Sequence, residues 1–83
     1  MKVTEKDIQR QCEILSRLIG KNVKMWSECG IYYCGITTES GGGVASVLTD
    51  RDSKRVVFGQ MAKMIYLLDY MGFKKLSIHY GEE

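Results

Sequence analysis

Two runs of alternating residues, 23–28 and 31–38, are separated by only two residues, Cys29 and Gly30. Alternation with a period of two is typical of strands that bury one face. A two-residue connection is the shortest common loop of a β-hairpin. If Cys29 and Gly30 form this turn, each residue of one strand has a fixed partner in the other. The spacing therefore predicts an antiparallel hairpin together with its register.

This register assigns the side chains of the hairpin to two faces. One face carries the pairs Glu28 with Ile31, Trp26 with Tyr33, and Lys24 with Gly35. The other face carries the pairs Val23 with Ile36, Met25 with Cys34, and Ser27 with Tyr32. We expect the second face, which is more continuously apolar, to lie against helices, and the first to be partly open to water. A shift of one residue in the turn would exchange the two faces.

A helix is predicted before the hairpin, over residues 5–19. Thr4 is a suitable N-cap, and Asp7 follows it at the spacing of a capping box. Gly20 supplies the stop signal that follows many helices. The apolar residues that recur at helical spacing, and that we expect to be buried, are Ile8, Cys12, Leu15 and Ile19.

A second helix is predicted over residues 54–71, with Ser53 as its N-cap and Gly72 after its end. Its apolar stripe consists of Val57, Met61, Met64, Ile65, Leu68 and Met71. A short strand over residues 44–49 precedes this helix. Residues 73–80 alternate again and indicate a fourth strand, or a terminal extension that docks on a partner. The chain is thus expected to form one α+β domain over residues 1–83, with order α-β-β-β-α(-β) and an antiparallel sheet packed on two helices.

The size and composition limit the classes of protein that this chain can represent. A chain of 83 residues has a small core, and oligomerisation is a common remedy, so we expect a homo-oligomer. No run of about 18 apolar residues occurs, and the N-terminus lacks the apolar stretch of a signal peptide, so no membrane partner is expected. Three cysteines without compact spacing favour a reduced, cytoplasmic setting. A net charge of +2 makes nucleic acid an unlikely partner.

Positive side chains stand where the second helix begins, at Lys54 and Arg55. The N-terminus of a helix carries partial positive charge, which disfavours cations and attracts anions. Together with Arg51, Ser53 and free backbone N–H groups, they would form a site for phosphate or carboxylate. Glycines 41–43, if folded toward this end, would let a ligand approach the backbone. The alternative is a solvated turn in which the cations pair with nearby aspartates.

The aromatic residues of the hairpin are a second candidate site. Trp26 and Tyr33 share the face expected to be open, where they would stack a base or seat a partner chain. Cross-strand aromatic pairs also stabilise sheets without any ligand. The sequence is compatible with three roles for this aromatic pair: sheet packing, self-association and ligand stacking.

Catalytic and metal-binding patterns are weak in this chain. Cys12, Cys29, Cys34 and His79 would formally make a zinc site, but no C-x-x-C pair is present. A Cys34–His79 nucleophile–base pair has no recognisable motif spacing around it. We therefore expect no catalytic residues, no metal and no cofactor, and a protein that is not an enzyme.

The segments GGGVASV and SKRVVFGQMAKMIYLLDYM together resemble a class of short, mostly uncharacterised accessory proteins encoded by bacteriophages and prophages. In that class a helix precedes a tyrosine-rich hairpin, a G-G-V strand and a helix that begins T/S-K-R/E. An aromatic follows five residues after the cap, here Phe58 after Ser53. The resemblance covers residues 8–71 and implies an accessory phage product that acts inside a bacterium. Some such proteins block a host protein, and others sequester a nucleotide signal used in host defence.

The sequence therefore favours a non-enzymatic binding module that captures a small anionic or nucleotide-like ligand. Such a module would use the helix start for phosphate and the aromatics for a base. The alternative is an inhibitor that binds a host protein through the open sheet face or the terminal strand. The α-β-β-β-α order also resembles double-stranded-RNA-binding domains, but only Lys54 and Arg55 match their lysine-rich second helix.

Overall fold

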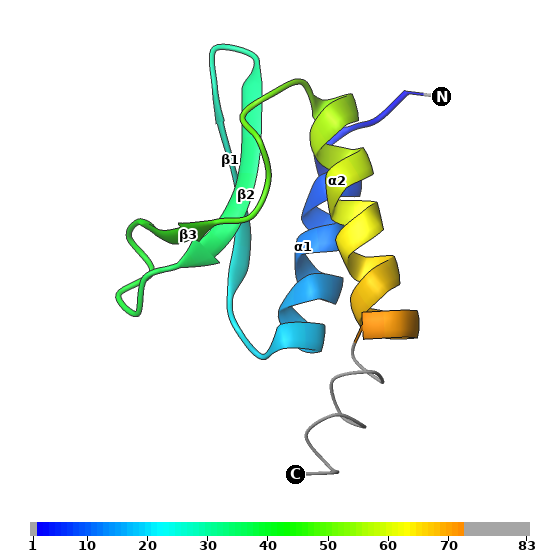
Figure 1. Ribbon diagram of the computed structural model, residues 1–83. Coiled ribbons are helices and arrows are strands. Elements are labelled where there is room, and N and C mark those ends of the chain that lie inside the picture. The colour runs from blue at the N-terminus through cyan, green and yellow to red at the C-terminus, as the bar shows by residue number, and fades with distance from the viewer. Residues whose placement is uncertain (1, 73–83) are drawn as a thin grey trace, which may run out of the picture.

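The computed structural model describes residues 2–72 of the chain, which form a small compact α+β domain. The elements in chain order are α1 (Glu5–Ile19), β1 (Val23–Glu28), β2 (Ile31–Thr37), β3 (Val44–Val47), α2 (Lys54–Tyr66) and η1 (Leu67–Gly72), a π-helical turn. The strands form one antiparallel sheet in the order β1-β2-β3. Both helices lie side by side on one face of this sheet, with their N-termini at the same end (Figure 1).

The hairpin has the predicted register along its whole length. Trp26 pairs with Tyr33 near the turn, and Val23 pairs with Ile36 at the far end. Cys29 has φ 52° and Gly30 has φ 78°. Positive φ at both central residues is the requirement of a type I′ turn, whose twist matches that of the two strands. The two-residue turn inferred from the spacing is therefore confirmed.

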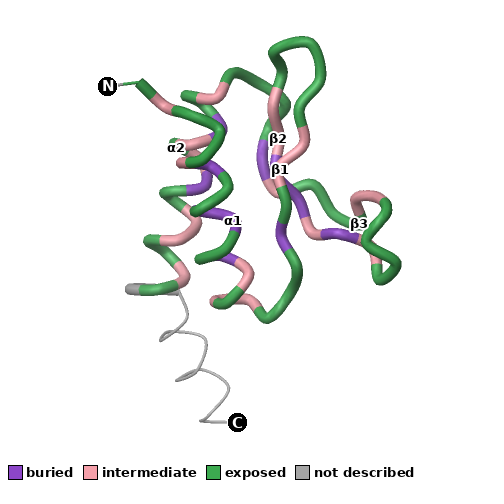
Figure 2. Tube along the Cα trace, turned by 180° about the vertical axis from the view of Figure 1, so that it is seen from behind, coloured by how far each residue is buried: buried purple, intermediate pink, exposed green. Residues whose placement is uncertain are grey.

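The face predicted to be buried does lie against the helices. Val23 and Cys34 are buried, and Tyr32 and Ile36 are half-buried on the same cluster. The fully buried apolar residues are Ile8, Cys12, Leu15, Val23, Cys34, Val57 and Met61. They occupy the space between the helix pair and the sheet, where Figure 2 shows the buried segments facing one another. The core is one layer thick and has contributions from α1, β1, β2 and α2.

Helix α1 has the predicted bounds and the predicted caps. The hydroxyl of Thr4 accepts a hydrogen bond from the Asp7 N–H at 3.3 Å, and the Asp7 carboxylate accepts one from the Thr4 N–H at 2.9 Å. The bond from the Thr4 N–H, foremost, and the nearby Thr4 hydroxyl lower the pKa of the Asp7 carboxyl group. At the other end Gly20 has φ 69°, a left-handed conformation that suits glycine.

Strand β3 is shorter than the predicted 44–49, because regular pairing stops at Val47. A register shift between Ile36 and Thr37 bends the ladder. The chain nevertheless stays beside β2, since the N–H groups of Leu48 and Thr49 both donate to the Cys34 carbonyl. The irregular segment 48–52 therefore continues the third strand without its regular geometry.

The second helix is also less regular than predicted. It is α-helical over Lys54–Tyr66 and continues as a π-helical turn over Leu67–Gly72, whereas we expected an α-helix over 54–71. Leu68 still packs against the core. Val57 and Met61 of the predicted stripe are buried, while Met64 and Ile65 are partly buried against the core. The burial of the Met71 side chain lies outside the described features. An apolar pattern does not distinguish an α-helical turn from a wider one.

The predicted fourth strand over 73–80 lies outside the described residues, and so does His79. Among residues 2–72, no helix has the length and apolar character needed to cross a membrane.

A pair of glycine substitutions tests the close contact between β2 and β3. A Cβ on Gly35 would lie 2.6 Å from Val44 Cγ2 and 2.7 Å from the Ser46 carbonyl oxygen. Gly35→Ala is therefore expected to lower the free energy of unfolding by about 2 kcal/mol, since overpacking of this kind forces the backbone to shift. Chemical denaturation measures this change.

The matched control is Gly59→Ala in α2, where a Cβ would meet nothing within 4 Å. Alanine is a better helix former than glycine, so Gly59→Ala is expected to raise the free energy of unfolding by about 1 kcal/mol. Similar effects of the two substitutions would contradict the described packing of β3 across Gly35.

Candidate functional site

The face of the sheet that points away from the helices carries the candidate site, and no helix among residues 2–72 covers it (Figure 1). Its apolar residues include Ile31, which is 45% exposed, and Val47, which is 44% exposed. Trp26 and Tyr33 on this face are half-buried. We call the residues Lys24, Trp26, Glu28, Ile31, Tyr33, Val47 and Arg51 the outer face.

Three planar side chains form a row across the outer face. The rings of Trp26 and Tyr33 are stacked, with centroids 5.5 Å apart and an interplanar angle of 13°. The Arg51 guanidinium carbon lies 4.8 Å from the Tyr33 ring centroid. Because β1 lies on one side of β2 and residues 48–52 lie on the other, Trp26 and Arg51 flank the Tyr33 ring from opposite sides.

This row limits the ways in which Trp26 and Tyr33 could stack on a ligand. Both faces of the Tyr33 ring are covered by neighbours within the chain. A flat ligand ring would have to stack on the far side of Trp26 or of Arg51. The aromatic pair predicted from the sequence is thus brought together, and it packs with Arg51 before any ligand is present.

Lys54 lies on the opposite side of β2 from Arg51. Its ammonium is 5.7 Å from the centroid of Tyr32, a ring that faces the helices. The Tyr32 hydroxyl donates a hydrogen bond to the Glu5 carboxylate at 3.1 Å. Partial burial and this carboxylate raise the pKa of Tyr32. The predicted cations Arg51 and Lys54 therefore do not converge on one ligand position.

The start of α2 already holds polar groups of the chain itself. The Ser53 hydroxyl accepts a hydrogen bond from the Val56 N–H at 3.4 Å, and the Asp52 carboxylate accepts one from the Ser53 N–H at 2.6 Å. Asp52 thus places negative charge where the helix dipole favours it. Arg55 is exposed beside it. Within the described part of the chain, Arg55 forms no salt bridge.

Asp50 is engaged by a glutamine instead of a cation. Its carboxylate accepts a hydrogen bond from the Gln60 amide at 2.8 Å, and its own N–H donates to the Gln60 carbonyl oxygen at 2.8 Å. This pair fixes the segment before α2 onto the helix. The alternative in which local aspartates pair with the cations therefore does not hold for Asp50.

The glycine-rich turn lies at the wrong end of β2 to join the start of α2. The turn is closed by hydrogen bonds from the Thr38 N–H to the Gly43 carbonyl and from the Gly41 N–H to the Thr38 carbonyl. It follows the last residue of β2, whereas α2 begins beside Tyr32, near the first residue. The expectation that glycines 41–43 frame an anion site with α2 is therefore not met.

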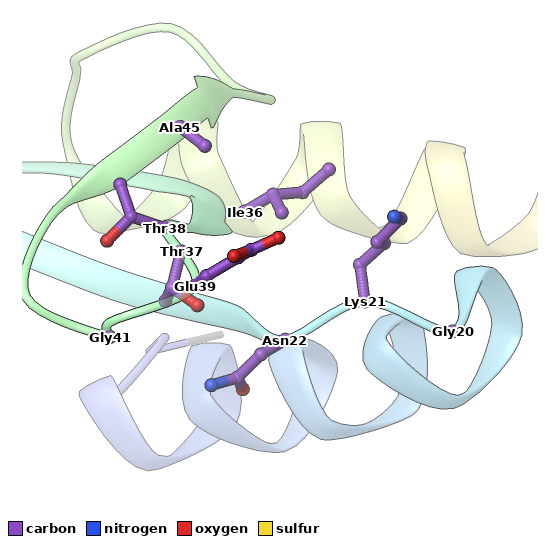
Figure 3. Close-up of a pocket in the computed structure, with 9 residues that line it drawn as sticks. All are labelled: Gly20, Lys21, Asn22, Ile36, Thr37, Thr38, Glu39, Gly41 and Ala45. Carbon is purple, nitrogen blue, oxygen red and sulfur yellow. The ribbon is translucent and has the colours of Figure 1, made fainter.

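A hollow of about 450 Å³ adjoins this turn instead (Figure 3). It is lined by residues 20–22 of the α1–β1 connection, by residues of β2 and the glycine turn, and by Ala45. Figure 3 shows Lys21 and Glu39 reaching toward it from opposite walls. Charges of both signs and no aromatic ring give it no clear ligand chemistry. None of the predicted site residues lines it.

A smaller hollow of about 230 Å³ lies on the outer face itself. It is lined by Glu28, Cys29, Ile31, Tyr33 and Arg51. The apolar floor and the carboxylate and guanidinium at its rim would accommodate one apolar side chain with polar neighbours. The Glu28 carboxylate makes it a poor site for a free anion.

The three cysteines do not converge in the structure. Cys12 and Cys34 face each other in the core, with their sulfur atoms 3.7 Å apart, while Cys29 is exposed in the hairpin turn. Among the described residues, no group of three or more metal-ligating side chains is placed to hold an ion. The formal zinc set from the sequence is thus not assembled by these residues.

Charge reversal at the two ends of α2 tests whether Arg55 has a structural role. Arg55→Glu is expected to raise the free energy of unfolding by about 0.5 kcal/mol, because a carboxylate replaces a cation at a helix N-terminus. The control Lys63→Glu makes the same charge change more than two turns further along a helix that continues through η1, so it should change the free energy of unfolding little. A loss in Arg55→Glu, measured by denaturant titration, would indicate a stabilising partner for Arg55.

Comparisons of the chain with protein-family models, with curated proteins and with solved structures find no match. The resemblance to phage accessory proteins therefore stays a prediction that depends on the sequence motifs.

Proposed function

We propose that the protein is a non-enzymatic binding protein that docks on another protein through its outer face. The observation that carries this proposal is the row of Trp26, Tyr33 and Arg51, flanked by exposed Ile31 and Val47. Tryptophan, tyrosine and arginine are the residues enriched in the hot spots of protein interfaces. Here they gather on a sheet face that neither α1 nor α2 covers.

The row is ordered before a partner arrives. Each planar group is held by its neighbour at stacking distance, so binding would cost less side-chain entropy than it would for free side chains. The Arg51 guanidinium lies over the Tyr33 ring, and this contact leaves N–H groups of the guanidinium able to donate. A carboxylate beside an apolar patch is the partner chemistry that fits this arrangement.

The resemblance to phage proteins supplies a context for the proposal. It implies a product that acts in the cytoplasm of a bacterial host, and the partner would then be a host protein whose activity is blocked by stoichiometric binding. A second copy of the chain is another possible occupant of the same face, in keeping with the expected homo-oligomer.

Capture of a small anionic or nucleotide-like ligand is the second candidate function. The observation that favours it is the pair of cations, Arg51 and Lys54, held over tyrosine rings close to the start of α2. In this arrangement an anionic group of the ligand would reach Arg51 or Lys54. The separation of the two cations by β2 and the carboxylate of Asp52 at the helix start weigh against it.

Affinity capture from phage-infected bacteria, followed by native mass spectrometry, tests the proposal. Trp26→Ala and Arg51→Ala should each weaken binding of a captured protein about tenfold or more, as hot-spot truncations do. Arg55→Ala is the matched control, since it removes an exposed cation outside the outer face. It should bind as the unchanged protein does.

Other outcomes separate the alternatives. A retained small anion whose binding is lost in Arg51→Ala and in Lys54→Ala, with no captured protein, would support the second candidate and contradict the first. A homodimer that dissociates in Trp26→Ala would place a second copy on the outer face. Equal binding by the outer-face variants and the control would overturn the proposed role of this face, provided that circular dichroism shows all variants folded.

A further inference from the structure

Two buried thiols from different elements meet in the core. Cys12 of α1 and Cys34 of β2 have their sulfur atoms 3.7 Å apart, within hydrogen-bond contact for thiols. Their side chains are 4% and 0% exposed. The two residues are almost equally buried. Their sulfurs have different surroundings, however, and this difference affects their reactivity.

Cys12 lines a surface hollow, whereas Cys34 does not. The hollow has a volume of about 370 Å³ and is bounded by residues 22–25 and by Gln9 and Glu13. A small molecule that enters between α1 and β1 would therefore meet the Cys12 sulfur first.

The contact between the two thiols also makes them chemically unequal. As the structure has it, the Cys12 thiol donates to the Cys34 sulfur. When Cys12 loses its proton, the Cys34 thiol can donate to the thiolate instead, and this bond lowers the pKa of Cys12, against the opposing effects of burial and of Glu13. The same bond, together with burial, raises the pKa of Cys34. Since the thiolate is the reactive form of cysteine, Cys12 is the better nucleophile of the pair.

We propose that Cys12 and Cys34 form a reversible intramolecular disulfide when the protein meets a peroxide, and that this bond ties α1 to β2. In the first step the Cys12 thiolate attacks the O–O bond of hydrogen peroxide. The bond breaks, Cys12 becomes a sulfenic acid, and the leaving hydroxide takes up a proton to become water. In the second step Cys34, having lost its proton, attacks the Cys12 sulfur, which expels its oxygen as a second water.

The two steps balance in atoms and in electrons. The two thiols together lose two electrons and two protons, and one peroxide molecule is reduced to two molecules of water. A thiol reductant such as dithiothreitol would reverse the reaction by disulfide exchange. The protein supplies both sulfurs, and the peroxide is the only co-reactant.

The geometry requires only a short movement. A disulfide has a sulfur–sulfur length of about 2.05 Å, so the two sulfurs must approach by roughly 1.7 Å. The residues are 22 positions apart in the sequence, so the bond would close a loop and restrict the unfolded chain. The oxidised protein should therefore be more resistant to heat than the reduced protein.

The experiment uses the full chain with Cys29→Asn, which removes the exposed thiol and leaves the buried pair. Asparagine suits the left-handed conformation of this turn position, where φ is 52°. Treatment with hydrogen peroxide should remove both thiols, lower the intact mass by two hydrogen atoms, and give a peptide that links positions 12 and 34. The thermal midpoint should rise by roughly 10 °C and return after dithiothreitol.

A second variant, Cys29→Asn with Cys34→Ala, separates the two steps. Without Cys34 the reaction should stop at a sulfenic acid on Cys12, which dimedone traps. If this variant does not fold, brief peroxide exposure of the Cys29→Asn protein with dimedone present reports the same intermediate. Retention of both thiols in the folded Cys29→Asn protein, or oxidation to sulfinic acid without a linked peptide, would overturn the proposal.

Discussion

The turn at Cys29 and Gly30 determines the arrangement on which the rest of the structure depends. Its positive φ angles at both positions fix the pairing of β1 with β2, and the pairing decides the face on which each side chain lies. Val23 and Cys34 are thereby directed to the helices, while Trp26 is directed to the open side. A slip of one residue would bury tryptophan and expose the core. The hydrophobic core and the outer face are thus two consequences of one register.

Much of this fold could be predicted because its signals are local. Caps, turn length and apolar period each involve residues within a few positions of one another, as Thr4 and Asp7 show. The errors lie where non-local contacts decide. The third strand is irregular over 48–52 because this segment must both run alongside β2 and lead into α2. A hydrogen bond from Gln60 holds Asp50 of this segment against the helix. Burial of Gln11, whose amide donates to the Phe58 carbonyl, likewise depends on how α1 meets α2.

The candidate site was only partly predictable, for a related reason. Residues 51–55 look like one cationic cluster in the sequence. In the structure Asp52 pairs with Tyr32, which places Arg51 beside Tyr33 and Lys54 beside Tyr32, on opposite sides of β2. Alternation along β2 sends neighbouring tyrosines to opposite faces, and each tyrosine takes one cation. No local pattern shows which irregular segment will pair with a given strand, so sequence spacing alone could not separate these charges.

The cations near the start of α2 experience two opposing effects, an unfavourable helix dipole and a favourable contact with an aromatic ring. An unfavourable charge at a helix terminus costs about 0.3–1 kcal/mol, and a cation held over an aromatic ring at an exposed site gains about 0.5–1 kcal/mol. The two effects are of the same size, so Arg51 and Lys54 are accounted for by the rings they contact, without a bound anion. Arg51 differs from Lys54 in one respect, because its ring belongs to the outer face. In the interface proposed here, that placement makes Arg51 the cation that a partner would meet.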